Sequence, residues 1–327
     1  MDMHGALLFA AGLATLVVAA EMVVRGASRL AASLGVEPLI LGLTVVAIGT
    51  SAPELAIGIT ASLQGSSSLA VGNIAGTNIV NILFILGLSA LLKPLPLHLQ
   101  VLKLELPIIV AAAVLMLVFA WDGVITQREG AVMLVGALIY TLALIRLSRR
   151  ETPAMHEEFS DMYGSSGART GTVAKERTKY TALLVVGLIL SVVGAHWLVN
   201  GAVGIARTLD ISEAIIGLTI VAIGTSAPEL VTSIVATIRN ERDVAVGNLL
   251  GSSIYNILVI LGLTCLVTPG GVPVERELIT VDIPLMAGVA LLCVPVFVTG
   301  RRVSRLEGGI GVALFVIYML WIVLHRA

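Results

Sequence analysis

Two glutamates inside long apolar segments are the residues of this sequence with the clearest chemical potential. Glu54 and Glu229 lie near the middle of segments 37–62 and 212–238, with no lysine or arginine in the neighbouring helical turns. An ionisable side chain within a membrane span is costly when it is unpaired. A carboxylate buried in this way either takes up a proton or binds a cation. We therefore expect both glutamates to face a proton or a transported cation.

The residues around each glutamate favour a metal cation. Thr50 and Ser51 precede Glu54 by four and three residues, so hydroxyl and carboxylate oxygens share one helix face. In the next apolar segment, polar side chains recur every four residues. The second half repeats both patterns, and the full set is Thr50, Ser51, Asn73, Thr77 and Asn81, then Thr225, Ser226, Asn248, Ser252 and Asn256. Singly, such residues join membrane helices. Together with two acids they offer only oxygen ligands, which favours Ca²⁺, Na⁺ or Mg²⁺ over Zn²⁺ or Cu⁺.

A proline next to each glutamate predicts a break in the helix that carries it. Pro53 has no N–H for the carbonyl of Gly49 and crowds it, and Pro228 and Gly224 repeat this arrangement. Freed carbonyl groups are ion ligands in many transporters, where paired broken helices mark the binding site. We therefore expect discontinuous second and seventh membrane helices.

Composition indicates the solvent that surrounds these helices. The 327 residues are 57% hydrophobic and 13% charged, with a mean hydropathy of +1.01, which suits lipid rather than water. The net charge of −1 gives no basic field for nucleic acid. Cys265 and Cys293 lie in apolar runs without metal-ligand spacing and are expected to be buried hydrophobic residues. We predict an all-α polytopic membrane protein.

Ten apolar segments are long enough to cross a bilayer core of about 30 Å. They are 5–27, 37–62, 69–92, 104–121, 127–147, 180–206, 212–238, 244–267, 279–299 and 304–325. Residues 148–179, between the fifth and sixth segments, are rich in Gly, Ser, Thr and charge, and are predicted to be a flexible linker.

The chain contains an internal repeat. Residues 39–88 align without a gap on 214–263, each position shifted by 175, and LGLTVVAIGTSAPEL matches IGLTIVAIGTSAPEL. This divides the chain into two five-helix units, 1–147 and 180–327. An odd number of helices in each unit predicts that the second unit crosses the membrane in the opposite sense.

Basic residues predict the orientation. With the N-terminus outside, 16 of the 20 lysines and arginines fall on the inner side, together with the linker. We therefore expect a cell-membrane protein with both termini outside and residues 148–179 in the cytoplasm.

Two further ionisable residues, Glu21 and His196, occupy equivalent repeat positions in the first and sixth segments. They differ in type, and we expect both to lack polar partners around them. We expect them to make local hydrogen bonds or line a gate rather than bind ions. Glu54 and Glu229 are then the only acids expected at depth, without a nucleophile and base beside them, so an enzyme is not expected.

The motifs GTSAPEL and GN-x-x-G-[TS]-x-x-x-N-I, each present once in both halves, resemble the alpha repeats of the sodium/calcium exchanger family, within the calcium/cation antiporter superfamily. The glutamate and the last asparagine of the motif are 27 positions apart in each half, as Glu54 and Asn81 and as Glu229 and Asn256. The likeness spans nearly the whole chain and is to the compact prokaryotic members, because the linker is too short for the calcium-sensing domains of animal exchangers.

The resemblance implies four cation subsites, with Glu54 and Glu229 shared between Ca²⁺ and Na⁺. Their partners would be the carbonyls of Ala47 and Ala222, the hydroxyls of Thr50, Ser51, Thr77, Thr225, Ser226 and Ser252, and the amides of Asn81 and Asn256. Many relatives have Asp at one of these two asparagines, so this pocket holds two carboxylates where theirs holds three.

The mechanism that the resemblance implies is exchange of about three Na⁺ for one Ca²⁺ by alternating access, in which the first and sixth helices slide across the rest. Such exchange moves net charge, needs no cofactor and is expected of a monomer in lipid. A Ca²⁺/H⁺ antiporter is the alternative, since both glutamates could accept protons, and Mg²⁺ or Mn²⁺ are alternative substrates. A passive cation channel is a third interpretation, which the repeated broken helices disfavour.

Overall fold

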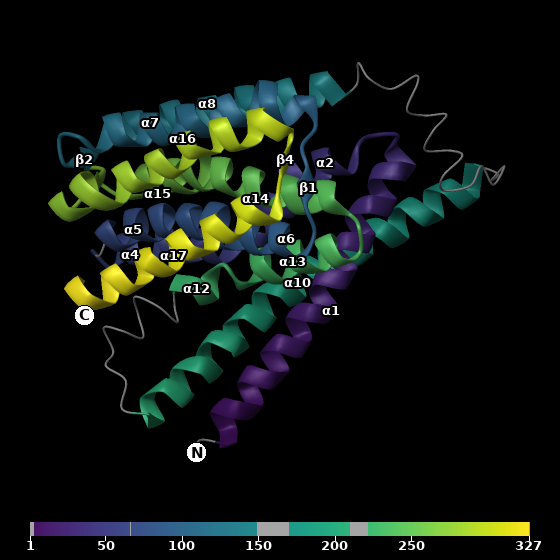
Figure 1. The fold of residues 1–327 in the computed structure, drawn as a ribbon, viewed down its shortest axis with the longest axis horizontal. Helices are drawn as coiled ribbons and strands as arrows, with labels where there is room; N and C mark the ends of the chain where they lie inside the picture. The colour runs from purple at the N-terminus through teal and green to yellow at the C-terminus, as the bar shows by residue number, and fades with distance from the viewer. Residues whose placement is uncertain (1–2, 66, 149–169, 210–221, 327) are drawn as a thin grey trace.

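The computed structural model describes residues 3–65, 67–148, 170–209 and 222–326, and almost all of them are helical (Figure 1). The α-helices of the first half are α1 (Met3–Leu34), α2 (Pro38–Leu41), α3 (Ala47–Thr50), α4 (Ala52–Leu63), α5 (Ser67–Ile79), α6 (Gly87–Leu92), α7 (Leu106–Ala120) and α8 (Gln127–Ser148). Those of the second half are α10 (Thr170–Thr208), α12 (Ala222–Thr225), α13 (Ala227–Ile238), α14 (Arg242–Tyr255), α15 (Gly262–Val267), α16 (Ile283–Gly300) and α17 (Arg305–Arg326).

Wider π-helical turns extend several of these helices. They cover Gly42–Val46, Val80–Leu86, Val101–Glu105, Asn256–Leu261 and Leu278–Asp282. Two of them contain Asn81 and Asn256, and two others end at the acids Glu105 and Asp282. Because π-turns within α-helices often occur at functional sites, these positions are of interest for the site described below.

Eight of the described helices are long and apolar enough to span a membrane, and the bent pair Pro38–Thr50 and Ala52–Leu63 gives a ninth. These nine correspond to nine of the ten predicted segments. The remaining segment, 212–238, is represented by α12 and α13, and its first part lies outside the described residues. The predicted polytopic helical membrane protein is therefore confirmed, while the count of ten stays a prediction.

The helix of the sixth segment starts earlier than predicted. We expected residues 148–179 to be linker, yet α10 begins at Thr170. Arg177 donates hydrogen bonds from Nη2 (2.6 Å) and Nε (3.2 Å) to the carbonyl of Ser33 near the end of α1. This contact ties the polar start of α10 to its neighbour. Most of the predicted linker, residues 149–169, lies outside the described residues.

Helices α1 and α10 form a pair that lies across one side of the other helices (Figure 1). Their contact depends on glycines at the crossing. A Cβ atom at Gly12 would lie 2.4 Å from the backbone nitrogen of Leu198, and one at Gly201 would lie 2.4 Å from that of Phe9. Larger residues would force the helices apart, so the pair packs backbone against backbone.

The spans Ser68–Leu92 and Arg242–Val267 form the centre of the remaining bundle. In the most apolar part of each of these two spans, 72% and 78% of the residues are buried, against 17–44% in the other six candidate spans. Residues 244–255 of α14 are all buried. Gly247 and Gly251 let α14 approach the backbone of the first broken helix, since added Cβ atoms would lie 2.7 Å from the carbonyl oxygen of Leu39 and 2.6 Å from that of Leu43. The polar stripe of α14 is thereby held against the first broken helix.

Four short strands join loops of the two halves. Strand β1 (Leu95–Pro96) pairs antiparallel with β4 (Arg302–Val303), and β2 (Val124–Ile125) pairs antiparallel with β3 (Val272–Pro273). The helices that follow β2 and β4 start alike. Glu129 accepts hydrogen bonds from the backbone N–H and hydroxyl of Thr126, and Glu307 accepts the same two from Ser304. Both are capping boxes, which fix the starts of α8 and α17.

Candidate functional site: a buried oxygen-lined pocket

The first broken helix bends at Ser51, next to the glutamate. The two parts, Pro38–Thr50 and Ala52–Leu63, meet at an angle of 41°, and Ser51 has φ −81° and ψ 12°. Pro53 then occupies the first turn of α4, where its missing N–H costs no hydrogen bond. The predicted break beside Glu54 is confirmed, and the carboxylate lies in the first turn of α4.

The second half repeats this break. Ser226 separates α12 from α13 with φ −84° and ψ 10°, and Glu229 lies in the first turn of α13. A carboxylate near a helix N-terminus is stabilised by the helix dipole. Ala222, which we expected to supply a carbonyl ligand, starts α12 at the edge of the described residues. Its role stays a prediction.

Glu54 and Glu229 are both completely buried. Both side-chain oxygens of Glu54, and Oε2 of Glu229, have no hydrogen-bond partner among the described residues. Buried polar atoms are rarely left in this state, because each costs about 1–3 kcal/mol or more when charged. The pocket therefore needs either protons on these acids or a bound cation.

Hydroxyl groups of one half contact polar groups of the other. The Ser51 hydroxyl donates to Glu229 Oε1 (3.1 Å), and the Thr50 hydroxyl donates to Asn248 Oδ1 (3.1 Å). The Ser252 hydroxyl donates to the carbonyl oxygen of Ala47 (3.3 Å). The two halves therefore build one site rather than two separate ones.

Several expected ligands are buried without a hydrogen-bond partner among the described residues. They are the hydroxyls of Thr77 and Ser226, both amide atoms of Asn81, and Oδ1 of Asn256. All four residues are buried. Hydroxyl and amide oxygens that face inward without partners suit the coordination of Na⁺ or Ca²⁺. Thr225 is buried as well.

The carbonyl of Ala47, which the resemblance gives as a ligand, already accepts hydrogen bonds. The Ala47 carbonyl accepts the backbone N–H of Ser51 (3.2 Å) as well as the Ser252 hydroxyl. It therefore keeps its helical hydrogen bond, because the helix bends at Ser51 without opening the preceding turn. A carbonyl oxygen has two lone pairs, so an ion at Ala47 would compete with the Ser252 hydroxyl.

Two contacts of the site were missed from the sequence. Asn256 donates from Nδ2 to Asn78 Oδ1 (3.3 Å), and Asn78 donates to the carbonyl of Ser253 (3.2 Å). Asn248 donates from Nδ2 to Ser233 Oγ (3.3 Å). Asn78 and Ser233 lie outside the repeated four-residue pattern. The signal that could have found them was a polar residue within an apolar segment.

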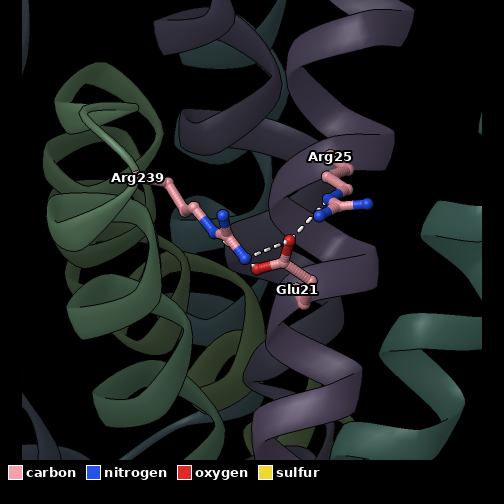
Figure 2. Close-up of polar contacts among 3 residues, drawn as sticks. All are labelled: Glu21, Arg25 and Arg239. Carbon is pink, nitrogen blue, oxygen red and sulfur yellow. Dashed lines mark hydrogen bonds and ion pairs between the residues drawn. The ribbon is translucent and has the colours of Figure 1, made fainter.

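The expectation that Glu21 lacks polar partners is wrong. Figure 2 shows Arg25 and Arg239 directed at its carboxylate, with Arg25 Nε and Arg239 Nη2 at 2.5 and 2.9 Å from Oε1. Arg239 ends α13, 218 positions away, so sequence proximity could not show it. His196 agrees better with a local role, because its Nε2 accepts a hydrogen bond from Asn200 (2.9 Å).

Glu54 and Glu229 are also not the only acids at depth. Glu105 is completely buried and Asp282 is 4% exposed. The Tyr140 hydroxyl donates to Glu105, and that of Tyr318 donates to Asp282 at 3.1 Å. Both acids lie near the start of predicted segments, and neither was singled out from the sequence. The same acid and tyrosine pair thus occurs in each half.

A cavity of about 310 Å³ reaches the break between α12 and α13. It lies between the α1 and α10 pair and the bundle, and its lining is Leu13, Leu198, Ile223, Gly224, Ala227, Leu230 and Val231. Gly224 and Ala227 flank the candidate ligands Thr225 and Ser226. This space between the helices therefore lies next to the site.

The oxygen donors fit a hard cation as cargo. No cluster of three or more His, Cys, Asp or Glu residues able to hold a metal occurs in the described part of the chain. The donors are instead two carboxylates with hydroxyl and amide groups. A helical membrane protein with such a buried pocket between two similar halves belongs to the class of cation transporters.

Comparison with known proteins identifies the family. The sodium/calcium exchanger protein family model matches residues 4–146 and 179–324, and the chain belongs to this family. It is 36% identical to the putative antiporter CaxA of Alkalimonas amylolytica over 94% of this chain and 95% of the relative. It is 32% identical to the sodium/calcium exchanger MaX1 of Methanosarcina acetivorans, over 95% of each chain.

Solved structures agree with this assignment. The fold matches the sodium-calcium exchanger NCX_Mj soaked with Na⁺ and Sr²⁺, with a TM-score of 0.83, 30% identity, and coverage of 98% of this chain and 99% of that one. It also matches the sodium/calcium exchanger from Methanococcus jannaschii, with a TM-score of 0.81 and 30% identity over 98% and 99% of the two chains.

Proposed function

We propose that this protein is a sodium/calcium antiporter that exchanges about three Na⁺ for one Ca²⁺ by alternating access. The observation that carries the proposal is the pair of buried acids, Glu54 and Glu229, three of whose four side-chain oxygens have no hydrogen-bond partner among the described residues. One Ca²⁺ neutralises the two carboxylates, whereas three Na⁺ leave one net positive charge. Exchange is therefore electrogenic.

The same charge explains the coupling. Moving two uncompensated carboxylates through a closed pocket is costly, because each buried charge without a partner costs several kcal/mol. The empty carrier therefore changes conformation rarely, and an ion must occupy the pocket in each direction. Na⁺ and Ca²⁺ compete for the same oxygens, so each leaves when the other binds.

The strand pairs support the proposed inversion of the two halves. β1 lies in the loop between the third and fourth segments, and it pairs with β4 in the loop between the ninth and tenth. If ten spans cross the membrane in turn, this pairing requires those loops on one side. β2 and β3 then meet on the other side. We place both termini outside and residues 148–179 in the cytoplasm, following the basic residues.

The moving unit in this mechanism is the pair of α1 and α10. It packs tightly within itself, and the cavity at Leu13 and Leu198 separates it from α13 at the end proposed to face outside. At its other end, Glu21 of α1 is bound to Arg239 of α13. Every candidate ligand belongs to one chain, so we propose that a monomer is functional.

Transport into sealed vesicles that contain the purified protein tests the proposal. Vesicles loaded with Na⁺ and diluted into Na⁺-free medium with radioactive Ca²⁺ should accumulate Ca²⁺, and a pH gradient alone should not drive uptake. Uptake driven by the pH gradient would identify a Ca²⁺/H⁺ antiporter instead. Rapid uptake with neither gradient would identify a passive channel.

A further inference from the structure

Two residues outside the expected ligand set form a chain of hydrogen bonds that ends at a site hydroxyl. Thr50 donates to Asn248 Oδ1 (3.1 Å), and Asn248 donates from Nδ2 to Ser233 Oγ (3.3 Å). All three side chains are completely buried. They belong to α3, α14 and α13, so the chain crosses from the first broken helix to the second.

The direction of the first bond matters because a hydroxyl has one proton. The Thr50 hydroxyl lies 3.1 Å from the amide oxygen of Asn248 and 3.4 Å from the carbonyl oxygen of Ala47. The carboxylate of Glu229 is a further acceptor nearby, because it accepts a hydrogen bond from the adjacent Ser51. If the proton goes to Glu229, it occupies a carboxylate oxygen that a cation needs. If it goes to Asn248, the Glu229 oxygen and the Thr50 lone pairs are both free for the ion.

Ser233 is the hydrogen-bond partner of the other end of the Asn248 amide. An asparagine amide can turn over and present either its oxygen or its NH₂ group. The Ser233 oxygen accepts the NH₂ group, so the amide oxygen is left facing Thr50. Without this acceptor, the NH₂ group could face Thr50 instead, and the hydroxyl would then turn toward Glu229.

The first half of the chain lacks the same device. The positions that match Ser233 and Asn248 under the 175-residue shift are Gly58 and Asn73. Nδ2 of Asn73 has no hydrogen-bond partner among the described residues. A Cβ atom at Gly58 would lie 2.9 Å from Thr264 Oγ1, so a serine there would collide with its neighbour. The arrangement is therefore a property of one half and not a general result of the repeat.

We propose that Asn248 and Ser233 are positioning residues, which hold the Thr50 hydroxyl as an oxygen ligand for the transported cation. This inference rests on the proposed function and deepens it. Neither Asn248 nor Ser233 needs to touch the ion.

The test is a double-mutant cycle on the full-length protein in detergent, with Ca²⁺ binding measured by titration calorimetry. Ser233→Ala should weaken Ca²⁺ binding by about threefold to tenfold, the effect of one net hydrogen bond. In a Thr50→Val background, Ser233→Ala should cause no further loss of Ca²⁺ affinity. Ser233 acts on the ion through the Thr50 hydroxyl, which this background lacks. Ser233→Thr keeps the acceptor and should bind Ca²⁺ as the parent does.

A matched control separates positioning from packing. Thr237→Val removes a buried hydroxyl one turn further along α13, where it donates only to the backbone of its own helix at Ser233. It should leave Ca²⁺ affinity unchanged. If Ser233→Ala does not fold, Asn248→Leu enters the same cycle. Parent-like affinity in Ser233→Ala, or a full additional loss in the Thr50→Val background, would overturn the inference, whereas absence of Ca²⁺ binding by the parent would instead reject the proposed function.

Discussion

The Ser51 hydroxyl donates a hydrogen bond to Glu229 Oε1 at 3.1 Å across 178 positions of the chain. Ser51 is the residue at which the first broken helix bends, and Glu229 is the acid of the second broken helix. The first break therefore contributes a hydrogen bond to the acid of the second half. A movement that separates the two breaks would dismantle the site, which links ion binding to conformation.

Replacing either acid with its amide should abolish transport. Glu54→Gln and Glu229→Gln each remove half of the negative charge of the pocket and one charged ligand, but they also relieve a buried charge. We expect near-normal expression and thermal stability, and Na⁺-driven Ca²⁺ uptake at background level. Glu129→Gln, in the capping box of α8, is the control and should keep transport. Exchange at the parent's rate in either site variant would mean that the pocket does not require both carboxylates.

The bond between Glu21 and Arg239 should influence the rate of exchange. It joins α1 to α13, and the two side chains are 23% and 54% exposed. Such a pair contributes about 1 kcal/mol or less, so Arg239→Gln should change turnover by about fivefold or less.

Arg25 provides the control for this pair, because it binds the same acid from within α1. Arg25→Gln should leave turnover close to that of the parent. Combining Glu21→Gln with Arg239→Gln should have no greater effect than Arg239→Gln alone. Additive effects of the two changes would show that the residues act separately.

Tyr140→Phe should destabilise the protein without removing a site residue. The Tyr140 hydroxyl donates to the buried Glu105, and its loss leaves a buried acceptor unsatisfied at a cost of about 1–3 kcal/mol. Thermal unfolding followed by tryptophan fluorescence should show a lower midpoint. Glu105→Gln in the Tyr140→Phe background should recover part of it, because the amide is uncharged. An unchanged midpoint in Tyr140→Phe would contradict a stabilising role for the hydrogen bond.

Single cysteines can test the proposed orientation. Cys265 and Cys293 are buried and free, so they should give little background with a membrane-impermeant thiol reagent. In intact cells, Gln64→Cys, at the end of α4, should be labelled from outside. Leu99→Cys, which is 50% exposed before α7, should be labelled only after the membrane is opened. The reverse pattern would invert the orientation and leave the site unchanged.

The sequence predicted the site best at the polar residues that occur in both halves of the chain. Glu54 and Glu229, their neighbouring hydroxyls, and the bend next to Pro53 could all be predicted, because a duplicated acid in an apolar segment has few explanations. The structure places Thr50, Ser51, Ser252 and Glu229 in contacts that join the two halves. The expected ligand role of Ala222 is untested, since the residues before it are outside the described part.

Contacts between distant helix faces could not be predicted in the same way. Ser233 and Asn248 meet because α13 and α14 pack side by side, and one sequence does not show which faces meet. Glu105 and Asp282 lie where apolar segments begin, so a small error in a segment boundary moves them from the interior to the surface. The pairing of Glu21 with Arg239 could not be predicted, because the two residues are 218 positions apart in the chain.

Competition between Na⁺ and Ca²⁺ for the purified protein tests the central claim, that one pocket holds either Ca²⁺ or Na⁺. Binding of radioactive Ca²⁺ would be measured at equilibrium over a range of Na⁺ concentrations at fixed pH and ionic strength, with choline replacing Na⁺. We predict complete displacement of Ca²⁺ with a Hill coefficient above one, because more than one Na⁺ occupies the pocket. Ca²⁺ binding that is unaffected by Na⁺ but lost on acidification would contradict the account and identify protons as the competing ion.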